Sequence, residues 1–180
     1  MRKLWPFLLI FCLLLSSTSF AAERIEAARA TIEENSDILW YDIQLLGVEG
    51  QGWSDTKAKF DRLPAKAEGV VRQAVWGLGR HSAGMAVRFK TDATTIVARW
   101  SLTSSSLDMP HMPATGVSGL DLYVKTESNQ WRWLANGRPS QFPANQATLV
   151  QDIPAGDREY LLYLPLYNGV TSVEVDLSSE

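Results

Sequence analysis

Short stretches in which apolar and polar residues alternate dominate the chain from Asp37 onward. In the clearest, Met85–Lys90, Met, Val and Phe would face one side of a strand, and Ala, Arg and Lys the other. Residues typical of turns separate such stretches. The pattern predicts strands at Leu39–Ile43, Val71–Leu78, Met85–Lys90, Thr95–Leu102, Leu120–Lys125, Trp131–Ala135, Ala147–Ile153, Tyr160–Leu164 and Val170–Leu177.

Several connections between these strands carry turn signals. Thr91–Thr94 predicts a hairpin between the two strands that flank it. Asn136-Gly137 is a strong turn dipeptide, and Pro154–Asp157 and Asn168-Gly169 are further turn signals. Many short strands without alternating helices predict an all-β domain, built as a sandwich, a jelly roll or a barrel.

The first 36 residues have a different character. Arg2 and Lys3 precede the apolar run Leu4–Leu15, and mostly small residues follow as far as Ala22. This order is typical of a secretory signal peptide, and the run is too short to span a bilayer comfortably. We therefore expect residues 1–21 to be a signal peptide and the protein to be secreted or periplasmic, with a retained anchor as the alternative. Residues 22–36 predict a short helix or flexible lead-in before a β domain at residues 37–180.

Composition narrows the classes of function. Cys12 is the only cysteine and lies in the apolar run, so the exported domain is expected to lack disulfides and thiol chemistry. The chain has 17 Lys and Arg against 20 Asp and Glu; without Arg2 and Lys3 the balance is 15 against 20, or −5. No basic patch stands out, so neither nucleic acid nor, after signal removal, a membrane is an expected partner.

Several short motifs follow one another in a fairly specific order. They are Arg62–Ala67, Val75–Leu78, Ser82–Gly84, Met109–Met112 and Gly119–Tyr123, the last being a Gly-x-Asp-Leu-Tyr motif. Together they resemble the N-terminal domain that precedes the catalytic domain in a group of bacterial SGNH, or GDSL-like, hydrolases. The resemblance implies a jelly-roll-like β-sandwich ahead of a flavodoxin-like esterase domain, which in relatives acts on esters, often acetyl groups on carbohydrates.

The catalytic motifs of these enzymes are missing from the sequence. It contains no Gly-Asp-Ser nucleophile block and none of the oxyanion blocks that follow it in the family, and Glu180 stands where such a catalytic domain would be expected to begin. Asp108 and His111 have the Asp-x-x-His spacing of an SGNH acid and base, but they lie mid-chain without a nucleophile. We expect no catalytic residue here, and any esterase activity in a catalytic domain present in cis or in trans.

The Ser101–Gly119 stretch is long and irregular for a β domain, which favours a functional loop. We expect Met109, His111 and Met112 to contact a ligand or a partner, because methionine adapts to apolar surfaces and histidine exchanges protons near neutral pH. The alternative is a loop folded over the sandwich with both methionines in the core.

A metal site is not predicted. His81 and His111 are the only histidines, and no tight ligand spacing surrounds them. No other cofactor is expected either, although calcium held by loop oxygens stays open.

Trp131 and Trp133 share one face of a predicted strand, because side chains alternate across it. The pattern favours a core face for this pair. The alternative is a platform on which sugar rings stack, with Trp53 in a Gly-rich loop as the more exposed candidate.

Asp121 and Tyr123 also share a face of their strand. The resemblance makes Gly119, Asp121 and Tyr123 signature residues with a structural role. As a signature residue in this resemblance, Asp121 is expected to be buried and hydrogen-bonded. From the residues alone, an aspartate between two leucines would satisfy backbone groups at a strand end or pair with a nearby arginine.

Two functions follow from these observations. The first is a non-catalytic accessory domain that packs beside an esterase domain and helps to shape its substrate cleft through the Ser101–Gly119 loop. The second is a free-standing secreted carbohydrate-binding protein. An exposed apolar patch around Met109 and Met112 would favour the first, and an exposed aromatic row the second.

Overall fold

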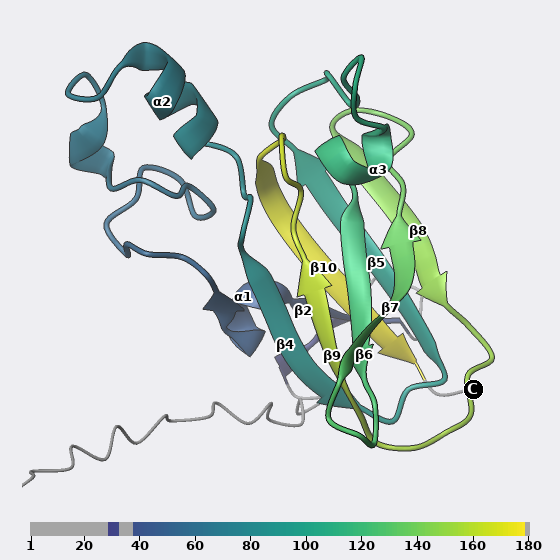
Figure 1. Ribbon diagram of the computed structural model, residues 1–180. Coiled ribbons are helices and arrows are strands. Elements are labelled where there is room, and N and C mark those ends of the chain that lie inside the picture. The colour runs from purple at the N-terminus through teal and green to yellow at the C-terminus, as the bar shows by residue number, and fades with distance from the viewer. Residues whose placement is uncertain (1–28, 33–37, 179–180) are drawn as a thin grey trace, which may run out of the picture.

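Two antiparallel sheets face each other in the computed structural model, which describes residues 29–32 and 38–178 (Figure 1). The β10 sheet has the strand order β1 (Thr31–Ile32), β2 (Leu39–Asp42), β10 (Val170–Ser178), β5 (Thr95–Leu102) and β8 (Ala144–Val150). The β9 sheet has the order β3 (Val48–Glu49), β4 (Ala86–Thr91), β9 (Arg158–Tyr163), β6 (Leu120–Lys125) and β7 (Trp131–Gly137). Neighbouring strands are antiparallel throughout. The predicted β-sandwich is therefore confirmed.

Alternating side chains build the core between the sheets. Val87 and Phe89 of β4 are buried from one side, and Ile96 and Trp100 of β5 from the other. Phe89 stacks on Tyr160 of β9 with ring centroids 5.6 Å apart. Burying one face of each sheet in this way is the main stabilising contribution to such a domain.

The strand predictions at Thr95–Leu102 and Leu120–Lys125 have the observed bounds. Most of the others shift by a few residues at one or both ends, where strand boundaries are least distinct. The two-residue strands β1 and β3 were not predicted, because they are too short to show alternation.

The hairpin predicted at Thr91–Thr94 is wrong. β4 belongs to the β9 sheet and β5 to the β10 sheet, so this connection crosses from one sheet to the other. Ala93 is buried within it, and its N–H donates to Thr91 Oγ1 at 3.0 Å. Two alternating strands and a four-residue link look the same in sequence whether they pair or face each other across a core.

The strand predicted at Val71–Leu78 is also wrong, because helix α2 occupies Gln73–Gly79. Trp76 and Gly79 share its buried side, while Val75 and Leu78 are exposed. The three-residue spacing of the buried pair is helical, but a seven-residue helix is too short for that period to stand out.

The turn predicted at Asn136-Gly137 lies inside strand β7, where these residues pair with Asp121 and Leu120. A Cβ on Gly137 would lie 3.2 Å from side-chain atoms of both Leu149 and Trp100. Gly137 therefore serves close packing between the sheets rather than a turn.

The predicted signal peptide at residues 1–21 lies outside the described residues, as does most of the lead-in at residues 22–36. Within the lead-in, Thr31–Ile32 forms β1 and pairs with Trp40 and Leu39 of β2. For these two residues the helical prediction is wrong, because they extend the edge of the β10 sheet.

Short helical segments lie in the connections between the strands. They are α1 (Ile43–Leu46), the 3-10 turn η2 (Ala65–Ala67), α2 and α3 (Ala114–Val117). Figure 1 shows α2 and its loops beside the sandwich, at the same end as α3. None of the helices in the described ranges is both long and apolar enough to cross a bilayer.

Candidate functional site

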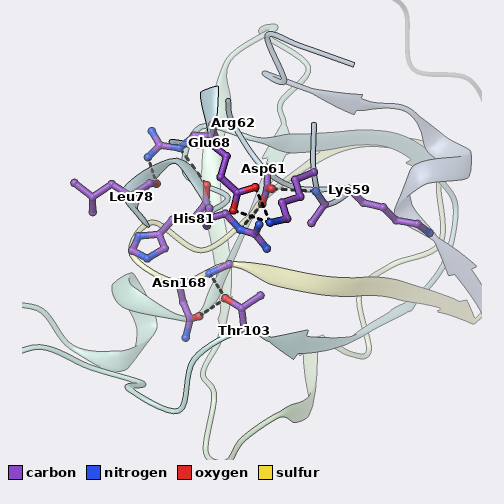
Figure 2. Close-up of polar contacts among 12 residues, drawn as sticks. Lys59, Asp61, Arg62, Glu68, Leu78, His81, Thr103 and Asn168 are labelled. Atoms are coloured by element: carbon purple, nitrogen blue, oxygen red, sulfur yellow. Dashed lines mark hydrogen bonds and ion pairs between the residues drawn. The ribbon is translucent and has the colours of Figure 1, made fainter. Parts of the chain in front are cut away.

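Asn168 joins the loops at one end of the sandwich. We call this the loop end, made of residues 78–83, 103–118 and 164–169. Asn168 is fully buried, and its Oδ1 accepts from Thr103 Oγ1 at 3.2 Å and Ser104 N at 3.1 Å (Figure 2). Its Nδ2 donates to Ser104 O at 2.9 Å and Ser118 Oγ at 3.0 Å. One amide therefore uses its two donors and two acceptor positions to hold both ends of the 103–118 loop against the β9–β10 connection.

The segment after α2 is held to the backbone of the same residue, Asn168. Ser82 donates from both N and Oγ to Asn168 O, at 3.2 Å each. A Cβ on Gly169 would lie 2.5 Å from Arg80 O and 2.7 Å from Thr103 Oγ1. The three chain segments touch so closely here that only glycine fits.

Arg62 closes the end of α2. Its Nε donates to His81 O at 3.1 Å, and its Nη2 donates to Leu78 O (Figure 2). Its backbone N–H donates to Gly79 O at 2.7 Å. The guanidinium thus bonds to one carbonyl in the last turn of α2 and one just beyond it. A positive charge is favourable at a helix C-terminus.

Asp61 is a buried carboxylate in the loop before α2. Its Oδ1 lies 3.2 Å from Arg80 Nε, and its Oδ2 accepts from Ala58 N at 3.0 Å. Arg80 also lies over the Trp76 ring, 5.8 Å from its centroid. This contact fixes the loop before α2 against the residue that follows the helix.

His81 borders the surface of the loop end. The ring is half-buried, its Nδ1 is buried without a hydrogen-bond partner among the described residues, and its centroid lies 6.4 Å from that of Tyr167. Burial lowers the pKa of His81, and the positive charge of Arg62 lowers it further. The imidazole is therefore neutral at pH 7.

An open cleft of about 490 Å³ lies beside His81. Leu166 and Tyr167 from the β9–β10 connection and Leu78 from α2 are exposed around it. Its lining is Arg62, Leu78, His81, Ala83, Met112, Leu166 and Tyr167. The cleft is thus mainly apolar, with a guanidinium at its border.

The loop predicted at Ser101–Gly119 reaches this cleft through a tight turn. Met109 and Met112 exchange backbone hydrogen bonds of 2.9 and 3.1 Å, with Pro110 and His111 at the tip. Met112 lines the cleft, and His111 is exposed without lining it. The structure shows no hydrogen bond between the side chains of Asp108 and His111, so their spacing in sequence does not produce an acid–base pair.

Gly119 marks a close approach between α3 and the β9 sheet. A Cβ at this position would overlap Thr115 O and lie 2.7 Å from Gly137 O. Ser118, the residue before it, accepts a 3.1 Å hydrogen bond on its carbonyl from Trp100 Nε1 in the core. The glycine lets α3 sit directly on the end of β6 and β7.

Asp121 lies on the outer face of the β9 sheet and is half-buried rather than buried. Its Oδ1 accepts from Asn136 Nδ2 at 2.9 Å and from Trp133 Nε1 at 3.2 Å. Asn136 Nδ2 also lies 3.4 Å from Thr115 O. Tyr123, on the same face, meets Tyr163 edge-to-face with centroids 5.7 Å apart.

The core interpretation of Trp131 and Trp133 is wrong, because both lie on the outer face of the β9 sheet. Trp131 is half-buried beneath Arg88 and Lys125, which lie 5.3 and 5.7 Å from its centroid. Trp133 is exposed, as is Trp53 in the loop after β3. The sequence showed that the pair shares a face but not which face is buried.

Neither histidine side chain is hydrogen-bonded to a hydroxyl or carboxylate in the part of the chain that the structure describes. In that part, no group of three or more His, Cys, Asp or Glu side chains is placed to hold a metal ion.

Comparison with known proteins identifies the domain. Residues 38–180 match the family model GxDLY, described as the N-terminus of SGNH hydrolase-type esterases. The chain belongs to this family. The family takes its name from the Gly-x-Asp-Leu-Tyr motif, which is Gly119–Tyr123 in this chain. The resemblance stated from the sequence is therefore confirmed.

A solved structure with the same fold supports this assignment, and a second solved structure is more distantly similar. A Bacteroides ovatus protein described as a GDSL-like lipase is 28% identical, with a TM-score of 0.73 over 80% of this chain and 42% of that protein. The salicylyl-acyltransferase SsfX3 from a tetracycline biosynthetic pathway is 17% identical, with a TM-score of 0.44 over 67% of this chain and 34% of that one. The GxDLY domain thus spans less than half the length of either protein. A search of curated proteins finds no match.

Sequence reasoning found one cleft residue of this GxDLY domain, Met112, and missed the others. Arg62, Leu78 and His81 lie in or beside the short motifs that carried the resemblance, which was the available signal. Leu166 and Tyr167 lie next to the predicted turn Asn168-Gly169, and no motif or alternation in the sequence marks them as cleft residues.

Replacing Asn168 with Ala should lower the free energy of unfolding by about 3 kcal/mol or more, because several buried polar groups lose their partner at once. Urea unfolding followed by tryptophan fluorescence measures this change. Ser105→Ala, in an exposed part of the same loop end, should stay within about 0.5 kcal/mol of the wild type. Equal stability of the two variants would show that the Asn168 network contributes little.

The lowered pKa of His81 predicts a dependence of stability on pH. The unfolded chain protonates this residue near its ordinary pKa of 6.5, whereas the folded chain does so only at lower pH. The unfolded state therefore binds more protons below about pH 6.5, and stability falls as pH drops through that range.

Urea unfolding at pH 7.5 and pH 5.5 tests this expectation. Wild type should lose more stability between the two than His81→Gln, which cannot take up the proton. His111→Gln, which changes an exposed ring, should follow the wild type. A parallel loss in wild type and His81→Gln would contradict the assignment.

Proposed function

We propose that this GxDLY domain is a non-catalytic accessory domain of an SGNH-type esterase, which packs beside the catalytic domain through its loop end and helps to shape the substrate cleft. The observation that carries the proposal is the exposed apolar cleft at the loop end. Family membership supports it, because the family is described as the N-terminus of SGNH hydrolase-type esterases. The catalytic domain would act in cis or in trans.

The exposed side chains around the cleft are of the kind that interfaces use. Leu78 and Leu166 leave apolar surface in water, which favours contact with a partner. Tyr167 and Arg62 add residue types that are enriched at interfaces, and Met112 adds an adaptable apolar contact.

The surface is also rigid enough to act as a template. The Asn168 amide and the Arg62 guanidinium hold three loops through buried or half-buried hydrogen bonds. A preorganised surface loses little conformational entropy on association. This rigidity supports a role in shaping a cleft, which requires side chains at fixed positions.

The cellular context and the substrate class are part of the same proposal. The signal-like sequence at residues 1–21 supports export to the periplasm or the outside. Carbohydrate esters are the proposed substrates of the partner domain, and the proposed connection of the strands is jelly-roll-like.

Leu166→Asp should weaken association with the SGNH catalytic domain of the same organism by at least about tenfold, because a carboxylate would be buried at the contact. Isothermal titration of the two purified proteins measures the dissociation constant, and hydrolysis of 4-nitrophenyl acetate reports turnover.

Leu45→Asp is the matched control, since Leu45 and Leu166 are each 43% exposed and Leu45 lies in α1, outside the loop end. It should bind as the wild type does, and both variants should keep the wild-type unfolding midpoint. Wild-type affinity of Leu166→Asp, or no association of the wild-type domain, would overturn the proposal.

A further inference from the structure

The outer face of the β9 sheet presents an exposed indole. The Trp133 side chain is 59% exposed, against 48% for Trp53, whereas Trp40 and Trp100 are buried. Leaving so large an apolar ring in water has a cost unless something covers it. The ring is therefore a candidate contact for a ligand.

The indole is also fixed in orientation. Trp133 stands opposite Tyr123 in the strand register, but its Nε1 donates to Asp121, two residues before Tyr123 in β6. This hydrogen bond restricts rotation of the indole, because Nε1 stays next to the carboxylate. Much of the ring nevertheless stays open to solvent.

Polar groups surround this flat surface. Asp121 Oδ1 accepts from both Trp133 and Asn136, and Oδ2 accepts no hydrogen bond from any described residue. The hydroxyls of Tyr123 and Tyr163 likewise show no hydrogen bond within the described part, and Tyr163 is exposed at the surface. One carboxylate oxygen and two phenols thus lie on the same sheet face as the ring.

This combination matches a sugar ring. A pyranose has an apolar face of C–H groups that stacks on an aromatic ring, and hydroxyls at its edge that bond to carboxylates and phenols. A purely apolar protein surface would leave the Asp121 carboxylate and the phenols without partners, at a cost in free energy. We propose that Trp133, Asp121, Tyr123 and Tyr163, here called the Trp133 platform, bind a pyranose unit of a polysaccharide.

The Trp133 platform lies next to the loop end, where the catalytic domain is proposed to dock. Asn136 links Asp121 to Thr115 in α3, and α3 belongs to the loop end. Figure 1 shows α3 directly above β6 and β7. A polysaccharide held on the platform can extend past α3 toward a catalytic domain at the loop end. That delivery rests on the proposed function, whereas sugar binding itself concerns this chain alone.

Affinity electrophoresis of the purified chain in gels containing xylan, hydroxyethyl cellulose or glycol chitin tests the platform. At least one polysaccharide should retard the wild type, and Trp133→Ala should reduce its affinity by about tenfold or more. Trp53→Ala is the matched control and should be retarded as the wild type is. Trp133→Phe, which keeps a ring but lacks the N–H, should bind with intermediate strength.

Thermal unfolding checks each variant, and an exposed Trp133 predicts an unchanged midpoint for Trp133→Ala. Migration unaffected by all three polysaccharides, or equal retardation of the wild type and Trp133→Ala, would overturn the inference. The outcome is separable from that of the proposed function. Sugar binding without association to a catalytic domain would overturn only the proposed function, and association without sugar binding only the platform.

Discussion

The loop end depends on the hydrogen bonds of one fully buried side-chain amide, that of Asn168. Its four hydrogen bonds join the segment between β9 and β10 to Thr103, Ser104 and Ser118, and the backbone carbonyl of the same residue accepts from Ser82. Separating any of these segments would leave a buried polar group unpaired, at about 1–3 kcal/mol for each. The cleft keeps its shape because its lining residues are attached to these segments.

The same network is continuous with the core. The Ser118 hydroxyl accepts a hydrogen bond from the Asn168 amide, and the Ser118 carbonyl accepts one from the Trp100 indole. Trp100 packs near Gly137. Gly119 has no side chain, which leaves room for the carbonyl oxygens of Thr115 and Gly137. Sheet packing, the signature glycine and the loop end therefore form one rigid unit, which is what a docking surface requires.

The sequence predicted the sheets better than the site, for a physical reason. Burial on one face imposes a period of two, so most strands were visible in the alternation of side chains. Local pattern could not show that β4 and β5 face each other across the core, nor that a seven-residue segment with Trp76 is helical. Asn136-Gly137 has the composition of a turn but serves strand packing.

The site was harder because its contacts are distant in sequence. Asn168 was seen only as a turn residue, although its amide partners lie 50 to 65 residues away. Nothing in the sequence around Asp61 indicates its ion pair with Arg80, which lies 19 residues away. Trp133 shares a face with Trp131, but alternation alone does not say which face of a sheet meets the core.

The two proposed surfaces fit a single arrangement. In the proposed arrangement the apolar cleft would face the catalytic domain, and the aromatic outer face of the β9 sheet would stay free for polysaccharide. Their common neighbour is α3, which contacts the platform through Asn136 and belongs to the loop end. An accessory domain with this arrangement would hold a polysaccharide close to the domain that cleaves its esters.

Hydrogen–deuterium exchange of the domain, alone and with its SGNH catalytic domain, tests the central claim most directly. The account predicts slower exchange on binding for amides of residues 78–83, 109–112 and 164–168, with unchanged exchange in β6 and β7. Protection confined to β6 and β7, or absent from all of these segments, would contradict it.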